Sequence, residues 1–532
     1  MIHSIRGLRG MAAAPHALAS QSALAVLREG GNAIEAMVAA AATIAVVYPH
    51  MNSIGGDAFW LISVPGQPVR GLDACGASAR VATRDWYRER GITQAIPFRG
   101  AVAANTVAGT VSGWNAALGL GRELGGRLPL ERLLADAIAY ARDGAPVTQS
   151  QRANTLAKSD DLRGLPGFAQ VFLPEGRAPE VGARFLQPAL ASTLQRLAHA
   201  GLDDFYRGDL ARSFATELQA AGSPLALEDL QSHRALWREP LSLRHSRGAL
   251  YNMPPPTQGV VSLMILGILD RLEIEGMDPN GADFVHAAVE ATKQAFRIRD
   301  RHVTDPARMK VDPASFLRAE TLDELRAGID PAKAAPWGAG RGPADTIWMG
   351  VVDSAGRAVS FIQSVYHEFG SGVVLGSSGV AWQNRGCSFS LDPAALNSLE
   401  PGRKPFHTLN PALAVLDDGR TMVYGNMGGD GQPQSQSAVF SRTVTFGMEP
   451  QAAITAPRWL LGRTWGRPSD TLKLESRFAP EVVDDLRRRG HEVELMQPFD
   501  EAMGHAQAIV RHRDGMLEGG ADPRSDGVVA AF

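Results

Sequence analysis

The stretch from Ala36 to Tyr48 constrains the fold more than any other segment, because every residue in it except Thr43 is apolar. Asn32 lies just before it and can accept hydrogen bonds from free backbone N–H groups, so we expect an N-capped helix that ends near Tyr48. A helix that is apolar on all sides belongs inside a layered fold. The stretch is too short to span a bilayer, which requires about 20 apolar residues.

The rest of the chain changes in character near residue 345. Residues 126–330 are predicted to be mostly helical, as in LERLLADAIAYARDG and in Ala282 to Arg301. The later segments TIWMGVVD, AVSFIQSVY, GVAWQN, PALAVLD and TMVYGNMG are rich in Val, Ile, Thr and aromatic residues, which favour strands. A loop of small and polar residues, Ala334 to Asp345, therefore separates a helix-rich first part from a strand-rich last part.

Composition and spacing exclude several classes of protein. The 53 basic and 56 acidic residues leave a net charge of −3, so neither a nucleic acid nor a membrane surface is expected as a partner. Cys75 and Cys387 are the only cysteines and lie far apart, which excludes a disulfide framework and a CxxC metal site. The 13 histidines never form HxH or HxxxH, so we expect no metal and no organic cofactor. The N-terminus has no continuous apolar stretch behind its arginines, so we expect no signal peptide and a cytoplasmic location.

The junction Asp345-Thr346 is the most informative place in the chain. A Gly/Pro-rich loop ends there at a threonine that opens the strand-like segment Thr346 to Asp353. The Thr346 hydroxyl could attack the preceding peptide bond, and cleavage would leave Thr346 as a new N-terminal residue. Its free α-amine, with an unperturbed pKa of about 7.7–8.0, could then act as the base for its own hydroxyl. A threonine at the start of a strand is also an ordinary β-former, so the pattern alone leaves both interpretations open.

A resemblance that runs along almost the whole chain bears on this choice. The matching pieces are Met11 to Ala14, Leu27 to Ala33, Ile54 to Phe59, Ala82 to Asp85, Asn105 to Gly113, Ala141 to Gly144, Asp204 to Gly208, Tyr251 to Thr257, Glu290 to Asp305, Thr346 to Asp353 and Gly425 to Gly431. Taken in this order, they resemble the γ-glutamyltransferase family of N-terminal-nucleophile hydrolases. The pattern DTxWMGVVD with MGGDGQPQ is most similar to the oxamate amidohydrolase branch of that family.

The resemblance implies a fold and a maturation step. It implies an α+β fold, an αββα sandwich of two stacked antiparallel sheets between helical layers. It also implies autocatalytic cleavage of a zymogen between Asp345 and Thr346, into a large chain of residues 1–345 and a small chain of residues 346–532. The two cleaved chains would associate as one αββα unit, and this processed heterodimer could pair as a homodimer.

The resemblance also assigns catalytic roles. Thr346 falls on the family's nucleophile, and Ser364 falls on a helper hydroxyl that hydrogen-bonds the nucleophile. Gly428 and Gly429 match the glycine pair whose N–H groups form the oxyanion hole. Glycine suits that role because the backbone must approach the substrate without an intervening Cβ.

The substrate pocket departs from the family pattern. The arginine that holds the γ-glutamyl carboxylate is replaced by Cys75, which we interpret as a small buried residue rather than a nucleophile. The clamp for the substrate's amino group falls on Tyr366, Arg385 and Ser388, and a serine pair becomes His407-Thr408. Arg385 and His407 could bind an anion from new directions, so the replacements together point to a changed substrate.

We therefore expect a hydrolase of C–N bonds, a self-processing threonine amidohydrolase that releases ammonia from a small anionic amide similar to oxamate. Three alternatives stay open. These are a γ-glutamyl hydrolase or transpeptidase acting on glutathione, a β-lactam side-chain acylase, and an unprocessed relative without catalytic activity.

Overall fold

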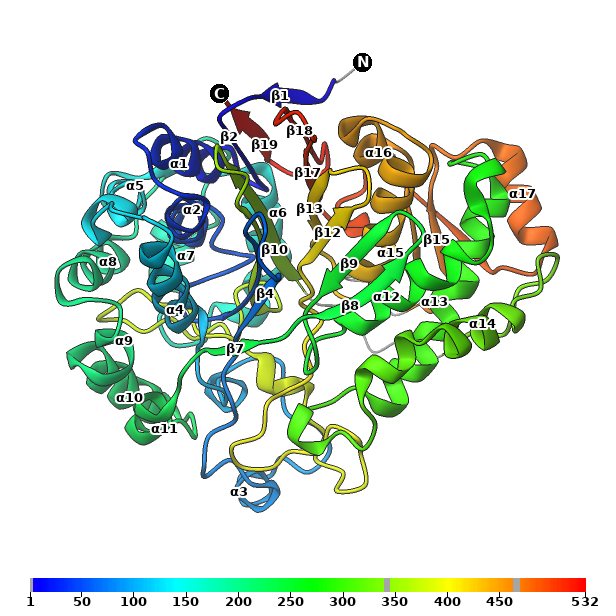
Figure 1. Cartoon of the computed structure of the whole chain (residues 1–532). Coiled ribbons are helices and arrows are strands. Elements are labelled where there is room, and N and C mark those ends of the chain that lie inside the picture. The colour runs from blue at the N-terminus through cyan, green and yellow to red at the C-terminus, as the bar shows by residue number, and fades with distance from the viewer. Residues whose placement is uncertain (1–2, 339–344, 463–468) are drawn as a thin grey trace.

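Two seven-stranded antiparallel sheets, stacked face to face, form the centre of the computed structural model, which describes residues 3–338, 345–462 and 469–532 (Figure 1). In spatial order, sheet I contains β1 (Ile5–Gly7), β18 (Leu517–Ala521), β17 (Ala506–Arg511), β13 (Thr421–Asn426), β12 (Ala412–Leu416), β9 (Gly248–Asn252) and β8 (Leu241–His245). Sheet II contains β19 (Val528–Ala531), β2 (Gly10–Ala14), β10 (Asp345–Asp353), β11 (Ala358–Tyr366), β3 (Asp57–Ser63), β4 (Arg70–Ala74) and β7 (Leu236–Arg238). Each sheet therefore combines strands from both sides of the Asp345-Thr346 junction.

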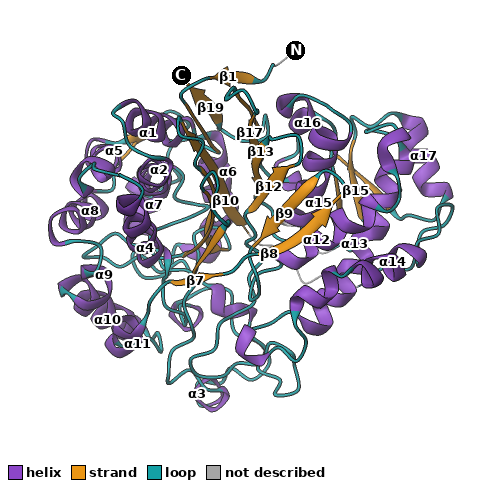
Figure 2. Cartoon of the chain, in the orientation of Figure 1, coloured by secondary structure: helices purple, strands orange, loops and turns teal. Residues whose placement is uncertain are grey.

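Helices cover the outer face of each sheet, which completes the expected four-layer sandwich (Figure 2). The helices packed on sheet II are α1 (Ala17–Arg28), α2 (Ala33–Val47) and α4 (Thr110–Glu123), with α5 (Leu130–Asp143) and α8 (Pro188–Ala200) beyond them. Those packed on sheet I are α12 (Gly259–Asp270), α15 (Gly431–Phe440) and α16 (Pro450–Thr455), with α13 (Ala282–His302) against α12 and α15 and α17 (Pro480–Arg488) against α13.

Shorter elements complete the chain. The remaining helices are α3 (Arg84–Arg88), α6 (Gln149–Leu162), α7 (Phe168–Phe172), α9 (Asp204–Arg207), α10 (Asp209–Ala221), α11 (Leu227–Ser232) and α14 (Ala319–Ala327). A small sheet contains β14 (Trp459–Leu461), β15 (Leu472–Glu475) and β16 (Val493–Met496), and β5 (Ala145–Pro146) pairs with β6 (Arg184–Phe185).

Strand alternation divides the core into three apolar layers. In β10, Ile347 and Met349 face the helices on sheet II, whereas Trp348 faces the layer between the two sheets. This inner layer also requires a glycine on the facing strand, because a Cβ on Gly425 of β13 would lie 2.1 Å from the Trp348 ring. By the same alternation, Thr346 faces the space between the sheets.

Helix α2 confirms the prediction made from the apolar stretch. The Asn32 side chain caps the helix by accepting hydrogen bonds from the N–H groups of Ile34 and Glu35. The Glu35 carboxylate accepts a hydrogen bond from the Asn32 N–H, which completes a capping box. Every residue from Ala33 to Val47 is buried between sheet II and α1, α4 and α5. An all-apolar helix is stable here because protein surrounds it on every side.

One expectation about local structure needs correction. The segment GVAWQN does not form a strand, because its backbone N–H groups donate to three separate places, Val373, Gly55 and Val365, and no continuous ladder can form. The predicted mostly helical part also contains the hairpin β8–β9, which forms one edge of sheet I. The predicted loop before Thr346 lies partly outside the described residues, at 339–344.

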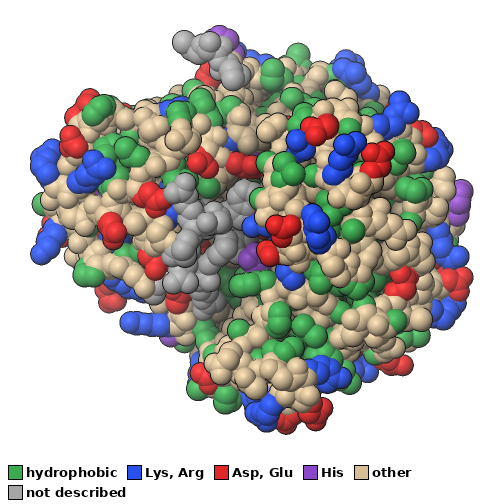
Figure 3. Space-filling model, turned by 180° about the vertical axis from the view of Figure 1, so that it is seen from behind, with side chains coloured by type: hydrophobic (Ala, Val, Ile, Leu, Met, Phe, Trp, Pro, Cys, Tyr) green, Lys and Arg blue, Asp and Glu red, His purple; other side chains and the backbone are tan. Residues whose placement is uncertain are grey.

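The surface agrees with the near-neutral charge. On the face in Figure 3, Lys and Arg side chains are interspersed with Asp and Glu, so no extended patch of one charge covers it. Among the described helices, none is both long enough and apolar enough to cross a membrane.

Candidate active site

Thr346 lies at the start of β10, at an irregularity in its pairing with β11. Asp345 pairs with Tyr366 while Ile347 pairs with Gln363, so β11 carries one extra residue opposite Thr346. Such a bulge redirects side chains, and bulges are common beside active sites. The Thr346 side chain is completely buried, and its Oγ1 lies 3.4 Å from Ser364 Oγ and 3.5 Å from Gln432 Nε2.

The structure thus brings Thr346 and Ser364 together as expected. Both distances are longer than an optimal hydrogen bond, as is common for catalytic contacts in the absence of substrate. Ser364 Oγ also accepts a hydrogen bond of 2.8 Å from the Tyr366 N–H, which fixes the serine hydroxyl beside the threonine. Ser364 therefore lies where it can orient the Thr346 hydroxyl.

Gly428 and Gly429 form the turn between β13 and α15. Their φ angles of 121° and 53° lie in the region that favours glycine. Among the described residues, neither N–H group donates a hydrogen bond, whereas both carbonyls accept one from the first turn of α15. Two adjacent N–H groups without partners among the described residues have the composition of an oxyanion hole.

A buried polar network supports this turn. The Gln258 side-chain amide donates to the carbonyl oxygens of Gly429 and Thr408, both at 2.9 Å. Arg299 in turn donates to Gln258 at 3.0 Å and forms an ion pair of 2.8 Å with Asp430. Both charged side chains are excluded from water, so removing either partner would leave an unpaired buried charge.

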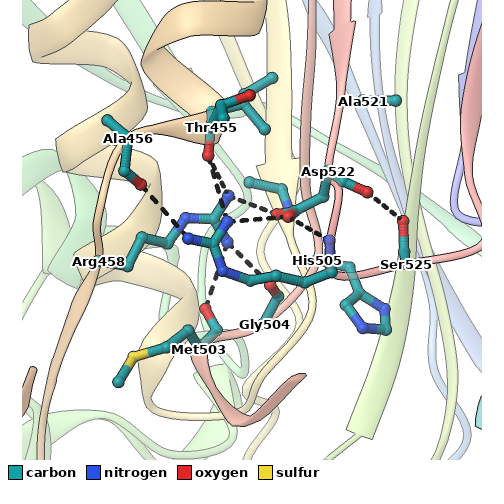
Figure 4. A network of polar contacts seen from close by, with 12 residues as sticks. Thr455, Ala456, Arg458, Met503, Gly504, His505, Ala521, Asp522 and Ser525 are labelled. Atoms are coloured by element: carbon teal, nitrogen blue, oxygen red, sulfur yellow. Dashed lines mark hydrogen bonds and ion pairs between the residues drawn. The ribbon is translucent and has the colours of Figure 1, made fainter. Parts of the chain in front are cut away.

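A second network fixes the loop on the other side of Gly428. The guanidinium of Arg458 donates to the carbonyls of Gly504 and Met503 and pairs with the Asp522 carboxylate (Figure 4). Asp522 also accepts a hydrogen bond of 2.6 Å from the Ala506 N–H. Because the Gly504 backbone lies against Gly428, Arg458 and Asp522 restrain the turn without contacting it.

The predicted substrate side is centred on Arg385, in a short helical turn (Arg385–Ser388). Its guanidinium is 1% exposed and lies 3.9 Å from the centre of the Tyr366 ring. None of its three nitrogen atoms has a hydrogen-bond partner among the described residues. A buried arginine without a hydrogen-bonded partner is rare because burial of a charge is costly, so this group is poised to bind an anion.

Among the other side chains predicted to bind substrate, His407 and Thr408 are buried, whereas Tyr366 and Ser388 are half-buried. The following polar atoms lack hydrogen-bond partners among the described residues: Ser388 Oγ, Thr408 Oγ1, both His407 ring nitrogens and Asp57 Oδ2. His407 Nε2 lies 3.5 Å from Asp57 Oδ2, and burial lowers the pKa of His407 well below its usual value. His407 is therefore neutral near pH 7, and Arg385 carries the positive charge of this region.

Cys75, the position that replaces the family arginine, is buried at the end of β4. Its N–H donates to Asp73, and Asp73 pairs with Lys404 at 2.6 Å. Burial raises the pKa of the Cys75 thiol well above its usual value, so the thiol stays protonated. A protonated thiol is a poor nucleophile, consistent with a small packing residue.

Comparison with known proteins identifies the family. The family model for gamma-glutamyltranspeptidase matches residues 19–532. The chain belongs to this family.

Its relatives cover the chain from end to end. The oxamate amidohydrolase proenzyme of Klebsiella pneumoniae is 60% identical over 98% of both chains. A glutathione hydrolase-like proenzyme of Bacillus subtilis is 40% identical over the full length of both. The crystal structure of a cephalosporin acylase from Bacillus halodurans superposes with a TM-score of 0.91 and 34% identity, covering 100% of this chain and 97% of that one.

Family membership confirms the αββα fold and the enzyme class. The chain is a hydrolase of C–N bonds of the N-terminal-nucleophile type, and a threonine nucleophile is typical of the family. Its similarity to the oxamate amidohydrolase proenzyme confirms the branch indicated by the sequence motifs.

The structure also places together one group that could hold a metal. Among the described residues, ligand atoms of His286, Glu290 and His491 lie within 4.8 Å of one another. His286 Nδ1 hydrogen-bonds His491 Nε2 at 2.8 Å, and Glu290 pairs with Lys293 at 2.7 Å. These atoms are already paired with protein groups, and an ammonium beside the carboxylate disfavours a second cation. The group is better explained as a structural network.

Sequence reasoning missed the residues that support the site. In the sequence, Asp57 stands out only as part of a motif, and no local pattern gives a role to Gln258, Arg299 or Asp430. Their partners lie tens to hundreds of residues away, so no local spacing connects them. The one available signal was that all four lie in or beside segments that resemble the family.

Proposed function

We propose that the chain is a self-processing threonine amidohydrolase that hydrolyses a small anionic amide, with oxamate as the substrate. The observation that carries the proposal is the buried guanidinium of Arg385, which has no hydrogen-bond partner among the described residues. The 60% identity with an oxamate amidohydrolase proenzyme supports it.

Maturation begins with attack by Thr346 Oγ on the carbonyl of the preceding peptide bond. An N-to-O acyl shift followed by hydrolysis releases residues 1–345 and frees the Thr346 α-amine. Thr346 is held for this reaction by β11, because Asp345 and Ile347 on either side of it both pair with that strand. The two chains stay associated, since each sheet contains strands from both.

In the processed enzyme, Thr346 Oγ attacks the amide carbonyl of the substrate while its own α-amine takes the proton. The N–H groups of Gly428 and Gly429 hold the oxyanion, an interaction typically worth about 3–4 kcal/mol for a donor. The amine returns the proton to the leaving nitrogen, and ammonia departs. Water activated by the same amine then cleaves the ester and releases the acid.

Substrate specificity follows from charge. A γ-glutamyl group brings an α-carboxylate and an α-amine, and each requires a partner when buried. Neither Cys75 nor Ser388 supplies the charge that the family uses for this purpose. Oxamate carries a single carboxylate beside its amide, and Arg385 can bind it with charge-assisted hydrogen bonds.

The test compares ammonia release from oxamate with glutamate release from glutathione by the same processed enzyme. We expect kcat/KM for oxamate to be higher by at least about a hundredfold, equivalent to roughly 2.7 kcal/mol. A higher value for glutathione would favour the γ-glutamyl alternative. A single intact band on a denaturing gel, with no activity, would favour the non-catalytic alternative.

A β-lactam side-chain acylase remains the second candidate, because the solved structure with a TM-score of 0.91 is a cephalosporin acylase. An acylase must accommodate a bulky bicyclic leaving group, whereas oxamate releases only ammonia. Release of the free β-lactam nucleus from a cephalosporin at a rate above oxamate hydrolysis would favour this candidate.

A further inference from the structure

Asp57 is a buried carboxyl at the same end of the sheets as the nucleophile. It lies opposite Ser364 in the pairing of β3 with β11, and Ser364 contacts Thr346. Residues directly opposite each other point to the same face of a sheet, so Asp57, Ser364 and Thr346 form one row across three strands. Two strand spacings place Asp57 about 10 Å from Thr346.

The two oxygens of Asp57 have different surroundings. Oδ1 accepts hydrogen bonds from the N–H groups of Gly76 at 3.0 Å and Gly109 at 3.1 Å. Oδ2 has no hydrogen-bond partner among the described residues and lies 3.5 Å from His407 Nε2. One oxygen is thus fixed by the backbone, and the other is available to a bound molecule.

Among the described residues, the full positive charge that acts on Asp57 is that of Arg385. His407 is neutral because burial lowers its pKa. Burial raises the pKa of the Tyr206 phenol and of the Cys75 thiol, so both of these groups are also neutral. The nearby charges of Lys404 and Asp73 pair with each other.

The protonation state of Asp57 therefore decides the charge of the site. An ionised Asp57 would neutralise Arg385 and repel a substrate carboxylate, leaving an extra negative charge buried. A neutral Asp57 would leave Arg385 free for the anion and would add an O–H donor. Burial raises the pKa of Asp57 to about 7, against the opposing effects of the Gly76 N–H, Arg385, the Gln383 side chain and the Gly109 N–H, so either state is accessible near neutrality.

We propose, building on the function proposed above, that Asp57 is a specificity-determining residue that binds substrate as a neutral acid. Its Oδ2–H donates a hydrogen bond to the same substrate carboxylate that Arg385 holds, and anion binding takes up a proton whenever Asp57 starts ionised. The site thus selects a carboxylate next to the scissile amide.

The experiment measures KM for oxamate between pH 6 and 8.5 with processed wild-type protein and with Asp57→Asn. In the wild type, KM should be constant at the acidic end and rise about tenfold per pH unit above about pH 7, because only the protonated fraction binds. Asparagine keeps an acceptor for the Gly76 and Gly109 N–H groups and places an N–H donor at the Oδ2 position. Its KM should therefore stay near the acidic wild-type value at every pH.

Glu501→Gln provides the matched control. Burial raises the pKa of Glu501 to about 7 as well, but its carboxylate accepts from Ser150 and lies outside the anion-binding group of side chains. This variant should keep the wild-type dependence of KM on pH. An α-amine has an unperturbed pKa of about 7.7–8.0, and Thr346 keeps its α-amine in all three proteins, so a loss of the pH dependence of KM in Asp57→Asn alone assigns that dependence to Asp57.

A second measurement tests the role of Asp57 independently of whether oxamate is the substrate. L-Lactate has the carboxylate of oxamate but no amide, and its binding can be followed by calorimetry in buffers of different ionisation enthalpy. At pH 8 the wild type should take up close to one proton per bound lactate, and Asp57→Asn should take up none. If the protein takes up a proton on binding lactate but does not hydrolyse oxamate, oxamate is refuted as the substrate and the role of Asp57 is not. Equal proton uptake in both proteins, or a KM for oxamate that is independent of pH in the wild type, would refute the role of Asp57.

Discussion

The two ends of the candidate active site are built from different kinds of structure. At the catalytic end, Thr346 and Ser364 belong to paired strands of sheet II, and Gly428 begins the turn between β13 and α15. At the anion-binding end, Arg385 lies in a short helical turn and His407 in the irregular segment before β12.

This difference explains how one fold can serve several substrates. Strand β11, which contains Ser364, pairs with β10 on one side and β3 on the other, so a change there disturbs the sheet. Side chains on connecting segments can change with less effect on the core. The catalytic end therefore matches the family pattern, whereas the anion-binding end differs from it at Cys75, Tyr366, Arg385, Ser388 and His407-Thr408.

The largest effect is expected at the catalytic end, with Thr346→Ala. Because the same hydroxyl performs processing and hydrolysis, this variant should remain a single intact chain and lose all activity. A denaturing gel and an ammonia assay with oxamate measure both effects. Thr346→Ser, which keeps a hydroxyl, should retain both reactions at reduced rates. Cleavage of Thr346→Ala at the same bond would show that another group is the nucleophile.

Arg385→Ala should impair substrate binding at one end of the site without affecting processing at the other. Loss of a buried charged partner typically costs at least about 2 kcal/mol, so KM for oxamate should rise at least about thirtyfold. Processing should continue at the wild-type rate, since no substrate carboxylate takes part in it. Arg385→Lys should give an intermediate KM because it keeps the charge but loses the planar fork. If Arg385→Ala blocks processing as strongly as hydrolysis, the two ends are not functionally distinct.

Ser364→Ala should have a smaller effect and a different pattern. A neutral hydrogen bond contributes about 0.5–1.5 kcal/mol, so processing and kcat should both fall roughly tenfold while KM stays unchanged. Ser364→Thr should restore both rates. Unchanged rates in the alanine variant would assign Ser364 to strand structure alone.

The smallest effect on function is expected far from both ends, with Asn32→Ala. This change removes the N-cap of α2 and should lower the free energy of unfolding by about 1 kcal/mol. Thermal unfolding measures the loss, and neither KM nor the processing rate should change at a temperature where the variant is folded. An altered KM would mean that a loss of stability far from the site also changes substrate binding. The KM changes of the other variants would then have to be corrected for their own losses of stability.

Prediction from the sequence succeeded where information was local. The apolar run after Asn32 predicted α2, and Ala282 to Arg301 predicted all but the last residue of α13. The strand after Thr346 was also predicted, since Val, Ile and Trp favour strands. The prediction of a strand for GVAWQN was wrong. Its composition favours a strand, but the N–H groups of Trp382, Gln383 and Asn384 donate to three separate segments.

The sequence by itself determined the elements with strong periodicity and the charge balance and, through its resemblance to a family, predicted the place of the nucleophile. Only the tertiary structure decided which distant side chains meet. Arg299 pairs with Asp430, and Asp57 lies near His407 and Arg385, a buried arginine without a hydrogen-bond partner in the part of the chain that the structure describes. The physical reason is that burial sets the cost of a charge and the pKa of a group. Burial depends on how four layers stack, and no local pattern in the chain records that stacking.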